Sequence, residues 1–457
     1  MSKQNKFINF IKKHILYFSF LIFFCFFILL IASLSILKYH YVSGENYKFL
    51  QKKILFLSEI PFNIKKIFQT DNLNINAPPY LKKHIKKDRI KHFVSTDKNA
   101  LLVLSRYNHS LASSVIDIIN LNNFKTIHSY KPDIKEIIKK TRDDYDYSNF
   151  KNYHSEIRSI LRHPLLLKDG SLITNSGGPI FKIDFCSKLV WLNDIGKFHH
   201  STELDHEKYI WQVGEYAPKN IYIDKYNKEI LDFFIFKLNT DGKIIYKKSV
   251  YKILIENKIL PENYAIITST NKNNQISPIH LNDIQPALKN TKYWKTGDLF
   301  LSLKHLHAIV HYRPNSNKII NYITGPFSHQ HDIDIISEKE ISIFNNNTIN
   351  DMNNSEVLIY NFENQKFTKV INEQLKKDNF QTTTNGLAHF FKDGSLLVEE
   401  QNHGRIIIYD KNGNKELEYV NKDKNGNIGL LKWVRVIENQ EFIDKFKKLS
   451  KNKVCLN

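Results

Sequence analysis

A histidine followed by a short apolar run recurs along this chain, and further short apolar runs follow each copy. The clearest copy begins at His163, where Pro-Leu-Leu-Leu precedes Asp169-Gly170, a dipeptide typical of a tight hairpin turn. Two more runs of strand-forming residues begin at Gly178 and Lys188. Repeated units of four short antiparallel strands are typical of β-propeller blades. The repeat therefore predicts an all-β fold.

Four other histidines open similar copies of the repeat. They are His200, His280, His331 and His389. A sixth, degenerate copy precedes them in residues 100–119, so we predict a six-bladed β-propeller, with five or seven blades as alternatives. The long interval before His280 indicates an insertion, in which residues 250–257 are expected to be helical, and Pro261 ends that helix. The apolar segment 431–437 either completes the last blade or closes the ring.

The first strand of each blade lines the central channel, so residues at equivalent positions of successive blades meet there. We therefore predict that the five opening histidines converge on one channel. A histidine at a strand start is usually structural, and we interpret His163 and His389 in this way. The other three have polar neighbours that favour a functional role. These neighbours are His199, Glu203, Asn282, Asp283, Asp332 and Asp334.

At these residues the chain resembles the bacterial arylsulfotransferases, the class that works without a nucleotide sulfate donor. The resemblance covers roughly residues 95–440. It is carried by residues 198–205, 280–283, 297–305, 325–335 and 398–405. Members of that family are six-bladed propellers, typically periplasmic, that move a sulfuryl group from a phenolic sulfate ester to another phenol. The resemblance thus implies an aryl sulfate donor and a phenolic acceptor as partners, and we expect no cofactor.

The resemblance also implies roles for individual residues. The family's nucleophile, which forms a sulfohistidine intermediate, falls on His331, and a second catalytic histidine falls on His200. A His-x-Asn pair falls on His280 and Asn282. The family's channel arginine falls on Lys304, which keeps a positive charge but lacks the planar fork that grips two sulfate oxygens at once. This departure puts turnover in doubt more than anion binding.

Other polar residues are weaker candidates. His199 and Arg405 are predicted to contact substrate, although a structural salt bridge is the alternative for Arg405. Strand alternation places Asp332 on the face opposite His331, which favours a role in bracing the blade.

Sulfuryl transfer requires an unprotonated nucleophile, and histidine is largely neutral near pH 7 because its unperturbed pKa is about 6.5. Burial and nearby Lys304 are expected to favour the neutral form of His331 further. A covalent intermediate divides the transfer into two displacements. His200, His280, Asn282 and Lys304 are expected to stabilise charge on the sulfuryl oxygens, and one histidine to exchange a proton with the phenols.

Residues 15–37 contain no charged side chain. At about 1.5 Å per residue this run spans a hydrocarbon core of about 30 Å. Lysines precede it at positions 3, 6, 12 and 13, which predicts a cytoplasmic N-terminus, a single-pass anchor in the inner membrane and a periplasmic propeller. A cleavable signal peptide is the alternative. The expected parts are a cytoplasmic N-terminus (1–14), a transmembrane helix (15–37), a stem (38–92), the propeller (93–440) and a tail (441–457).

The formal net charge of +20 comes from lysines scattered through the chain rather than from basic blocks. Because no aromatic-basic stacking pattern accompanies them, we predict no nucleic-acid partner. Cys186 and Cys455 lie outside the apolar run, and their pairing stays open, although Cys186 is interpreted as a buried strand or turn residue. Homodimer formation also stays open.

Two rival functions remain at this point. A propeller with the same channel can bind an anionic ligand or protein without turnover, and Lys304 favours that alternative. Three imidazoles brought together can also hold a divalent cation, although no local ligand spacing indicates one, so no metal site is predicted.

Overall fold

The computed structural model describes nine stretches of the chain. They are residues 14–15, 17–33, 81–94, 98–142, 159–216, 229–230, 232–261, 275–349 and 353–455. The chain divides into two compact units, Met1–Asn76 and Ala77–Asn457. In the first unit residues 17–33 are helical, and most of their side chains are exposed. No helix of the described residues has both the length and the apolarity that crossing a membrane requires. Most of the predicted stem lies outside the described residues.

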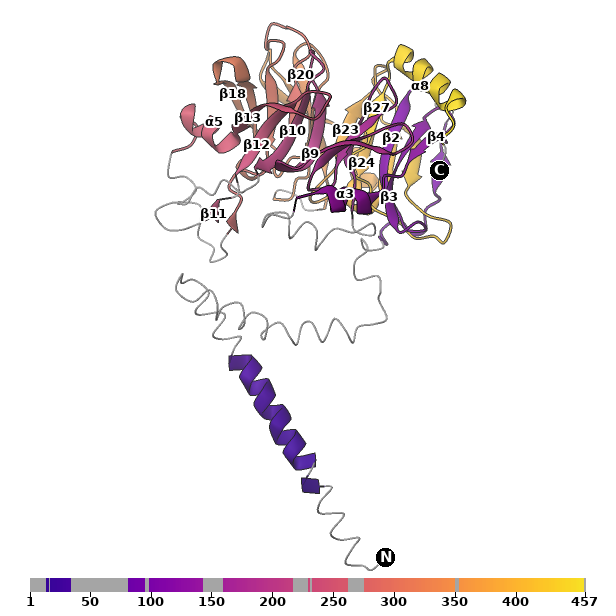
Figure 1. The fold of residues 1–457 in the computed structure, drawn as a ribbon. Coiled ribbons are helices and arrows are strands. Elements are labelled where there is room, and N and C mark those ends of the chain that lie inside the picture. Colours follow the sequence, from indigo (N-terminus) through magenta and orange to yellow (C-terminus); the bar gives the residue numbers. More distant parts are fainter. Residues whose placement is uncertain are drawn as a thin grey trace, which may run out of the picture. The chain divides into compact units, whose positions relative to one another are not determined.

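The second unit is a six-bladed β-propeller, as predicted (Figure 1). Blade 1 consists of β27 (Arg435–Ile437), β2 (Leu101–Asn108), β3 (Ser113–Asn120) and β4 (Lys125–Tyr130). Blade 2 consists of β5 (Arg162–Leu166), β6 (Leu172–Asn175), β7 (Ile180–Ile183) and β8 (Leu189–Asn193). Blade 3 consists of β9 (Gly196–Leu204), β10 (Ile210–Tyr216), β12 (Phe233–Leu238) and β13 (Ile244–Ser249).

The other three blades follow in chain order. Blade 4 consists of β15 (Leu281–Pro286), β16 (Leu299–Leu303), β17 (Ala308–Arg313) and β18 (Lys318–Thr324). Blade 5 consists of β19 (Ile333–Ile335), β20 (Glu340–Asn345), β21 (Glu356–Asn361) and β22 (Lys366–Val370). Blade 6 consists of β23 (Leu387–Phe390), β24 (Leu396–Glu400), β25 (Arg405–Tyr409), β26 (Lys415–Val420) and β1 (Ile90–His92).

Short helices and one small sheet complete the described fold. The helices are α3 (Ile134–Lys140), α5 (Val250–Glu256), α7 (Asn372–Lys377) and α8 (Gln440–Asn452), with 3-10 turns η2 (Lys304–Leu306), η3 (Pro314–Ser316) and η4 (Gln401–His403). Strand β11 (Glu229–Ile230) lies between β10 and β12 of blade 3 and pairs in parallel with β14 (Gln275–Ile276), which belongs to the insertion between blades 3 and 4. Helix α5 confirms the helix predicted in that insertion, and its N-cap Ser249 accepts a hydrogen bond from the backbone of Lys252.

Segments near both ends of the second unit take part in the propeller. Strand β27 pairs with β2, so the C-terminal segment supplies the innermost strand of blade 1 and closes the ring. Of the two predicted roles for residues 431–437, ring closure is the correct one. At the other end, β1 pairs with β26 as the outermost strand of blade 6. The propeller therefore begins before the predicted boundary at residue 93.

The predicted C-terminal tail folds onto blades 1 and 2. Helix α8 begins at the N-cap Asn439 and buries Ile443 and Phe446 in a cluster shared with the cores of those blades. A disulfide joins Cys186 to Cys455, with Cα atoms 5.4 Å apart. Cys186 is half-buried in the turn after β7, which agrees with the prediction of a strand or turn residue, and its pairing, which the sequence left open, depends on the position that the fold gives to a cysteine 269 residues away.

The apolar residues of each strand pack between neighbouring blades. In one cluster Leu165 and Ile173 of blade 2 meet Phe198, Ile210 and Phe236 of blade 3, and all five are buried. Every strand of these blades is short, and alternate residues face the two neighbours, which explains the alternating apolar pattern of the sequence.

Hydrogen bonds from backbone N–H groups to side chains connect successive blades around the channel. Four of the five below join residues at the innermost strands, and the fifth joins Val434, just before β27, to Glu399 on β24, the second strand of blade 6. Thr202 donates to His163 Nδ1 (3.2 Å), Ile284 to Ser201 Oγ (3.0 Å), Ile333 to Asp283 Oδ2 (2.8 Å), Ala388 to Asp332 Oδ2 (3.2 Å) and Val434 to Glu399 Oε2 (3.0 Å). Asp332 thus braces blade 5 against blade 6, as its place on the strand predicts.

Candidate active site in the propeller channel

The histidines that open the predicted repeats all lie at the innermost strands of their blades. His163 lies on β5, His200 on β9 and His389 on β23, while His280 and His331 immediately precede β15 and β19. The innermost strands of neighbouring blades contact one another around the channel. The sequence-distant histidines therefore come together as predicted, with the exception of His389.

Three of them form the centre of a histidine cluster. The ring of His200 lies 5.5 Å from the ring of His280 and 5.4 Å from that of His331. His199 joins the cluster at 4.6 Å from His200. Trp433 packs beside it, with its ring 4.5 Å from His331 and 4.8 Å from His163. Residues from blades 1 to 5 therefore meet at one place.

The cluster continues beyond the predicted residues. His305 lies 5.0 Å from His280, and His329 lies 5.9 Å from His305 and 4.9 Å from His307. These three histidines were not predicted as site residues. The available signal for His305 and His329 was their position within the segments 297–305 and 325–335, which also carry Lys304 and His331, whereas His307 lies just beyond the first of them.

The hydrogen bond of His331 determines its tautomer. Its Nδ1 lies 3.1 Å from the carbonyl oxygen of Gly386, which can only accept, so Nδ1 carries the hydrogen. Nε2 therefore presents a lone pair, and this buried atom has no hydrogen-bond partner among the described residues. Burial, then the charges of Lys304 and His280, hold the pKa of His331 well below its usual range. The ring is neutral, buried and oriented.

The neighbouring imidazoles are kept neutral in the same way. Burial lowers the pKa of His280 to about 3, with Lys304 as the next contribution. Burial, followed by the charge of His199, holds the pKa of His200 well below its usual range. The Nδ1 atoms of His199 and His200 are hydrogen-bonded to each other, which requires one to donate and the other to accept.

Lys304 lies beside these histidines, but in the turn η2 that follows β16 rather than on the strand. Its backbone N–H donates to the carbonyl of His280 at 2.9 Å. Burial lowers the pKa of its ammonium group. The charge of Lys304 nevertheless contributes to the lowered pKa values of His280 and His331, so it is close enough to act on both.

Asn282 has a structural partner. Its Nδ2 donates to the carbonyl of Gln330 at 2.8 Å, which joins blade 4 to blade 5. Its Oδ1 is buried without a hydrogen-bond partner among the described residues. In this arrangement the free group of Asn282 is an acceptor, which suits a hydroxyl group better than a sulfate oxygen.

A cavity of about 380 Å³ opens next to the cluster. It is lined by Arg162, Gly177, Lys197, His199, His200, Glu215, Phe233, His280, Asn385, Gln401, Lys432 and Trp433. His331 is not exposed in it, and its ring contacts two lining residues, His200 and Trp433. Gln401 Oε1 accepts the N–H of Gly386, which in turn orients His331.

Two cations in this cavity were missed by the sequence reasoning. Burial lowers the pKa of Arg162 to about 10 and that of Lys432 to about 7. Arg162 immediately precedes the opening histidine of its blade, as His199 does, and this shared position is the signal that was available. Lys432 carries no such signal, because it reaches the channel only through ring closure.

Arg405 lies elsewhere. Its side chain is fully buried, and its Nε and Nη1 bind Glu400 (2.6 Å) and Glu418 (3.1 Å). Its Nη2 donates to the carbonyl of Asp378 at 3.0 Å. Arg405 is not among the residues that line the cavity, and its contacts match the alternative interpretation, a structural salt bridge within blade 6.

A second cavity of about 140 Å³ also has Trp433 in its lining. His163 and His389 line it together with the carboxylates of Glu203, Asp332 and Asp334 and the guanidinium of Arg435. Burial raises the pKa of Asp334 to about 6. Arg435 is already paired with Glu203 at 3.0 Å. His389 therefore lies apart from the histidine cluster, as its structural interpretation implies.

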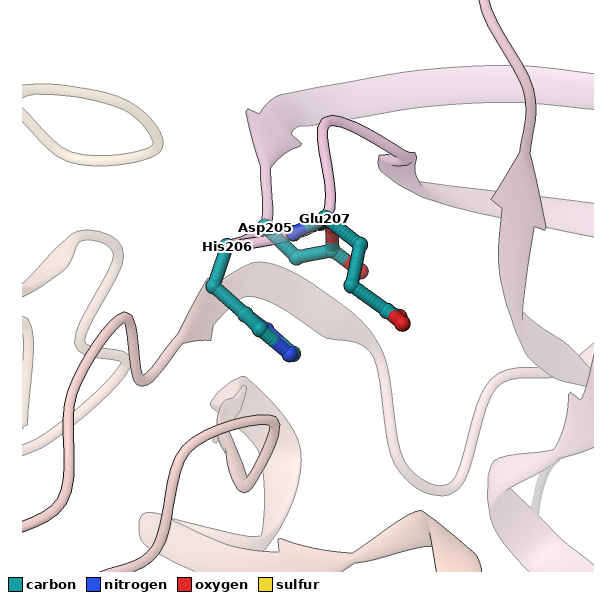
Figure 2. A group of neighbouring side chains, drawn as sticks. All are labelled: Asp205, His206 and Glu207. Atoms are coloured by element: carbon teal, nitrogen blue, oxygen red, sulfur yellow. Dashed lines mark hydrogen bonds between the residues drawn. The ribbon is translucent and has the colours of Figure 1, made fainter.

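Among the described residues, one group of side chains has the proximity that a metal ion requires. It consists of Asp205, His206 and Glu207 on the turn between β9 and β10 (Figure 2). Lys237 Nζ already bridges this turn, at 2.8 Å from Asp205 and 3.0 Å from Glu207. The group does not include the channel histidines.

Comparisons with solved structures yield matches of low similarity. A protein of unknown function from Bacteroides caccae has a TM-score of 0.46 at 11% identity, over 75% of this chain and 100% of that one. A streptogramin B lyase scores 0.40 at 10% identity, over 75% and 96%. A chain of a nidogen/laminin complex scores 0.41 at 8% identity, over 74% and 99%.

No curated protein matches the chain. A family model described as arylsulfotransferase (ASST) matches residues 163–422, which is more than half of the 457 residues. The matched region runs from the first opening histidine of blade 2 past the end of blade 6 and contains the whole predicted set of channel histidines. This chain therefore belongs to the arylsulfotransferase family.

Proposed function

We propose that the protein transfers a sulfuryl group from a phenolic sulfate ester to a phenolic acceptor, with Nε2 of His331 as the nucleophile. The observation that carries this proposal is the hydrogen bond from Nδ1 to the Gly386 carbonyl. It leaves the lone pair on Nε2, while burial keeps the ring unprotonated. An imidazole in this state is nucleophilic near neutral pH.

The reaction consists of two displacements at sulfur. In the first, Nε2 bonds to sulfur, the bond between sulfur and the ester oxygen breaks, and the phenolate leaves and takes up a proton. In the second, the acceptor phenol gives up its proton, its oxygen bonds to sulfur, and the N–S bond breaks. The cycle has no net proton change, and His331 returns to its neutral form.

His200, His280 and Lys304 assist both steps in this proposal. N–H groups of the two histidines donate to oxygens on which negative charge develops, and Lys304 adds its positive charge at the same place. Because His331 contacts His200 and Trp433, one of these rings must turn aside when the substrate enters.

Incubation with 4-nitrophenyl sulfate and a phenol tests the proposal directly. We expect release of 4-nitrophenol, and a mass increase of one SO₃ group on the peptide containing His331 when the acceptor is omitted. His331→Ala should lose at least about 10³-fold in rate, because the covalent route is removed. His389→Ala is the matched control, since His389 lies in the other cavity, and should retain most activity.

The alternative function is a propeller that binds an anionic ligand or partner without turnover. It is favoured by the lysine at position 304, where the resemblance implies an arginine. If wild type and His331→Ala bind an aryl sulfate equally and neither releases the phenol, the binding function replaces the catalytic one.

We also propose that the propeller lies outside the cytoplasm, anchored in the inner membrane by residues 15–37. The uncharged run and the Cys186–Cys455 disulfide support this location, because disulfides persist in oxidising compartments. When the protein is isolated from cells in the presence of an alkylating reagent, Cys186 and Cys455 should stay unmodified until the disulfide is reduced. The protein should also stay with the membranes after alkaline extraction. Free thiols at both positions would contradict the location, and release with a shortened N-terminus would indicate a cleaved signal peptide.

A further inference from the structure

Two cations line the larger cavity without a carboxylate bound to either. Arg162 belongs to β5 of blade 2, and Lys432 immediately precedes Trp433 in the closing segment. Among the described residues neither side chain forms an ion pair. Both side chains are half-buried, and holding an unpaired cation away from water is costly, so such groups are uncommon unless they are paired.

Arg162 occupies space that the backbone leaves for it. Its Nη1 is buried and has no hydrogen-bond partner among the described residues. Gly177 faces it so closely that a Cβ atom at this position would lie 2.3 Å from Nη1. Gly177 also has a φ of +83°, a conformation that favours glycine. Glycine at 177 therefore provides the room in which the guanidinium faces the cavity.

Lys432 is positioned next to Arg162 by the backbone. Its N–H donates to the carbonyl of Ser105 at 3.0 Å, and its carbonyl accepts from the N–H of His163, the residue after Arg162, at 3.3 Å. The charge of Arg162 contributes to the lowered pKa of Lys432. Two like charges are thus held close together, where each destabilises the other unless an anion lies between them.

The carboxylates near Arg162 and Lys432 already have other hydrogen-bond or ion-pair partners. Glu399 is the one whose charge acts on Lys432, and its oxygens accept the N–H groups of Trp433 (3.1 Å) and Val434 (3.0 Å). Glu215 lines the cavity but lies 3.7 Å from both Lys197 and His199. The cavity as a whole remains positive, because among the described residues Arg162 has no carboxylate partner and Lys432 feels the charge of Glu399 without forming an ion pair with it.

We propose that Arg162 and Lys432 bind the sulfate oxygens of the donor ester, and that Arg162 supplies the planar fork that Lys304 lacks. A guanidinium can donate two parallel hydrogen bonds to two oxygens of one sulfate group, and a lysine adds a point charge. The identification of the anion as an aryl sulfate rests on the proposed function. The positive cavity itself does not.

The test measures binding in the His331→Ala background, so that turnover cannot interfere. Calorimetric titration compares 4-nitrophenyl sulfate with 4-nitrophenol, which has the same ring without the sulfonate. Arg162→Met should weaken binding of the sulfate ester by about 10- to 100-fold, because it removes charge-assisted hydrogen bonds, and should leave nitrophenol binding unchanged. Lys432→Met should also weaken binding of the sulfate ester.

Two controls separate this role from loss of fold. Arg162→Lys keeps the charge without the fork and should give an intermediate loss. Lys197→Met removes a lining cation that lies near Glu215 and should change the affinity by less than about threefold. Arg162→Met and Lys432→Met should unfold at or above the temperature of the parent, because removing an unpaired and partly buried charge relieves a cost of folding.

Equal affinities of Arg162→Met and its parent for 4-nitrophenyl sulfate would overturn the proposal, whatever the wild type catalyses. If the wild type transfers no sulfuryl group but its affinity for the ester depends on Arg162, the anion site stands and the proposed reaction fails. If transfer proceeds normally in Arg162→Met, the reaction stands and this assignment fails.

Discussion

The most informative single residue is His331, because one backbone carbonyl decides its chemistry. Had its Nδ1 faced a donor, the lone pair on Nε2 would not be available. The carbonyl of Gly386 excludes that tautomer. Gly386 has a φ of +117°, so the acceptor is held by a backbone conformation that other residues adopt with strain.

His280 provides a test of burial at residue scale. Its folded-state pKa is lowered to about 3, whereas in the unfolded chain it titrates near 6.5. The unfolded state therefore binds a proton first as the pH falls, so this residue's contribution to stability is present above pH 6.5 and is lost between pH 6.5 and about 3. The loss amounts to about 1.4 kcal/mol per pH unit.

His280→Asn should lack this dependence. Asparagine tolerates the left-handed backbone of position 280, where φ is 52°. The free energy of unfolding is measured in denaturant at pH 7.5, 6 and 5 for both proteins. As the pH falls, wild type should lose stability relative to the variant. A constant difference across this range would show that folding does not lower the pKa of His280.

At the scale of elements, β27 connects the site to the closure of the ring. This strand pairs with β2, and the residues just before it, Lys432 and Trp433, line the larger cavity. The cavity is therefore completed by the last strand of the propeller in sequence, while its histidines come from the middle of the chain. The cavity is therefore complete only when the ring is closed.

Two truncations test this connection. A chain ending at residue 438 keeps β27 and should fold, although it loses α8 and the disulfide. A chain ending at residue 430 lacks the innermost strand of blade 1 and should lose both cooperative unfolding and affinity for 4-nitrophenyl sulfate. Circular dichroism during thermal unfolding, with the same calorimetric titration, distinguishes them. Equal behaviour of the two chains would separate ring closure from the site.

The sequence predicted the repeating elements well and their partners less well. Histidine-led apolar runs with hairpin turns identified six blades, because strand alternation and turn residues are local properties. The closing strand, the extra strand β1 and the disulfide each join segments that are far apart in sequence. No local pattern indicates such pairs, which is why the sequence placed the propeller between residues 93 and 440 and left the pairing of Cys186 open.

At the scale of the whole molecule, the propeller fold gathers charged side chains that are scattered through the sequence into two separate cavities. The net charge of +20 is scattered through the sequence, yet the fold brings Arg162, Lys304 and Lys432 to the histidine cluster. It brings carboxylates to the second cavity, which shares Trp433 with the first. The channel thus has a cationic and an acidic compartment, and an anionic substrate fits only the former.

The sequence by itself determined the repeat, and with it the preferred count of six blades and the convergence of His200, His280 and His331, because periodic strands must stack around an axis. Only the tertiary structure decided which nitrogen of His331 is free, that Arg405 is internally paired, and that Arg162 and Lys432 are not. Those properties depend on which backbone carbonyl or carboxylate lies within hydrogen-bonding distance, and such neighbours come from other blades.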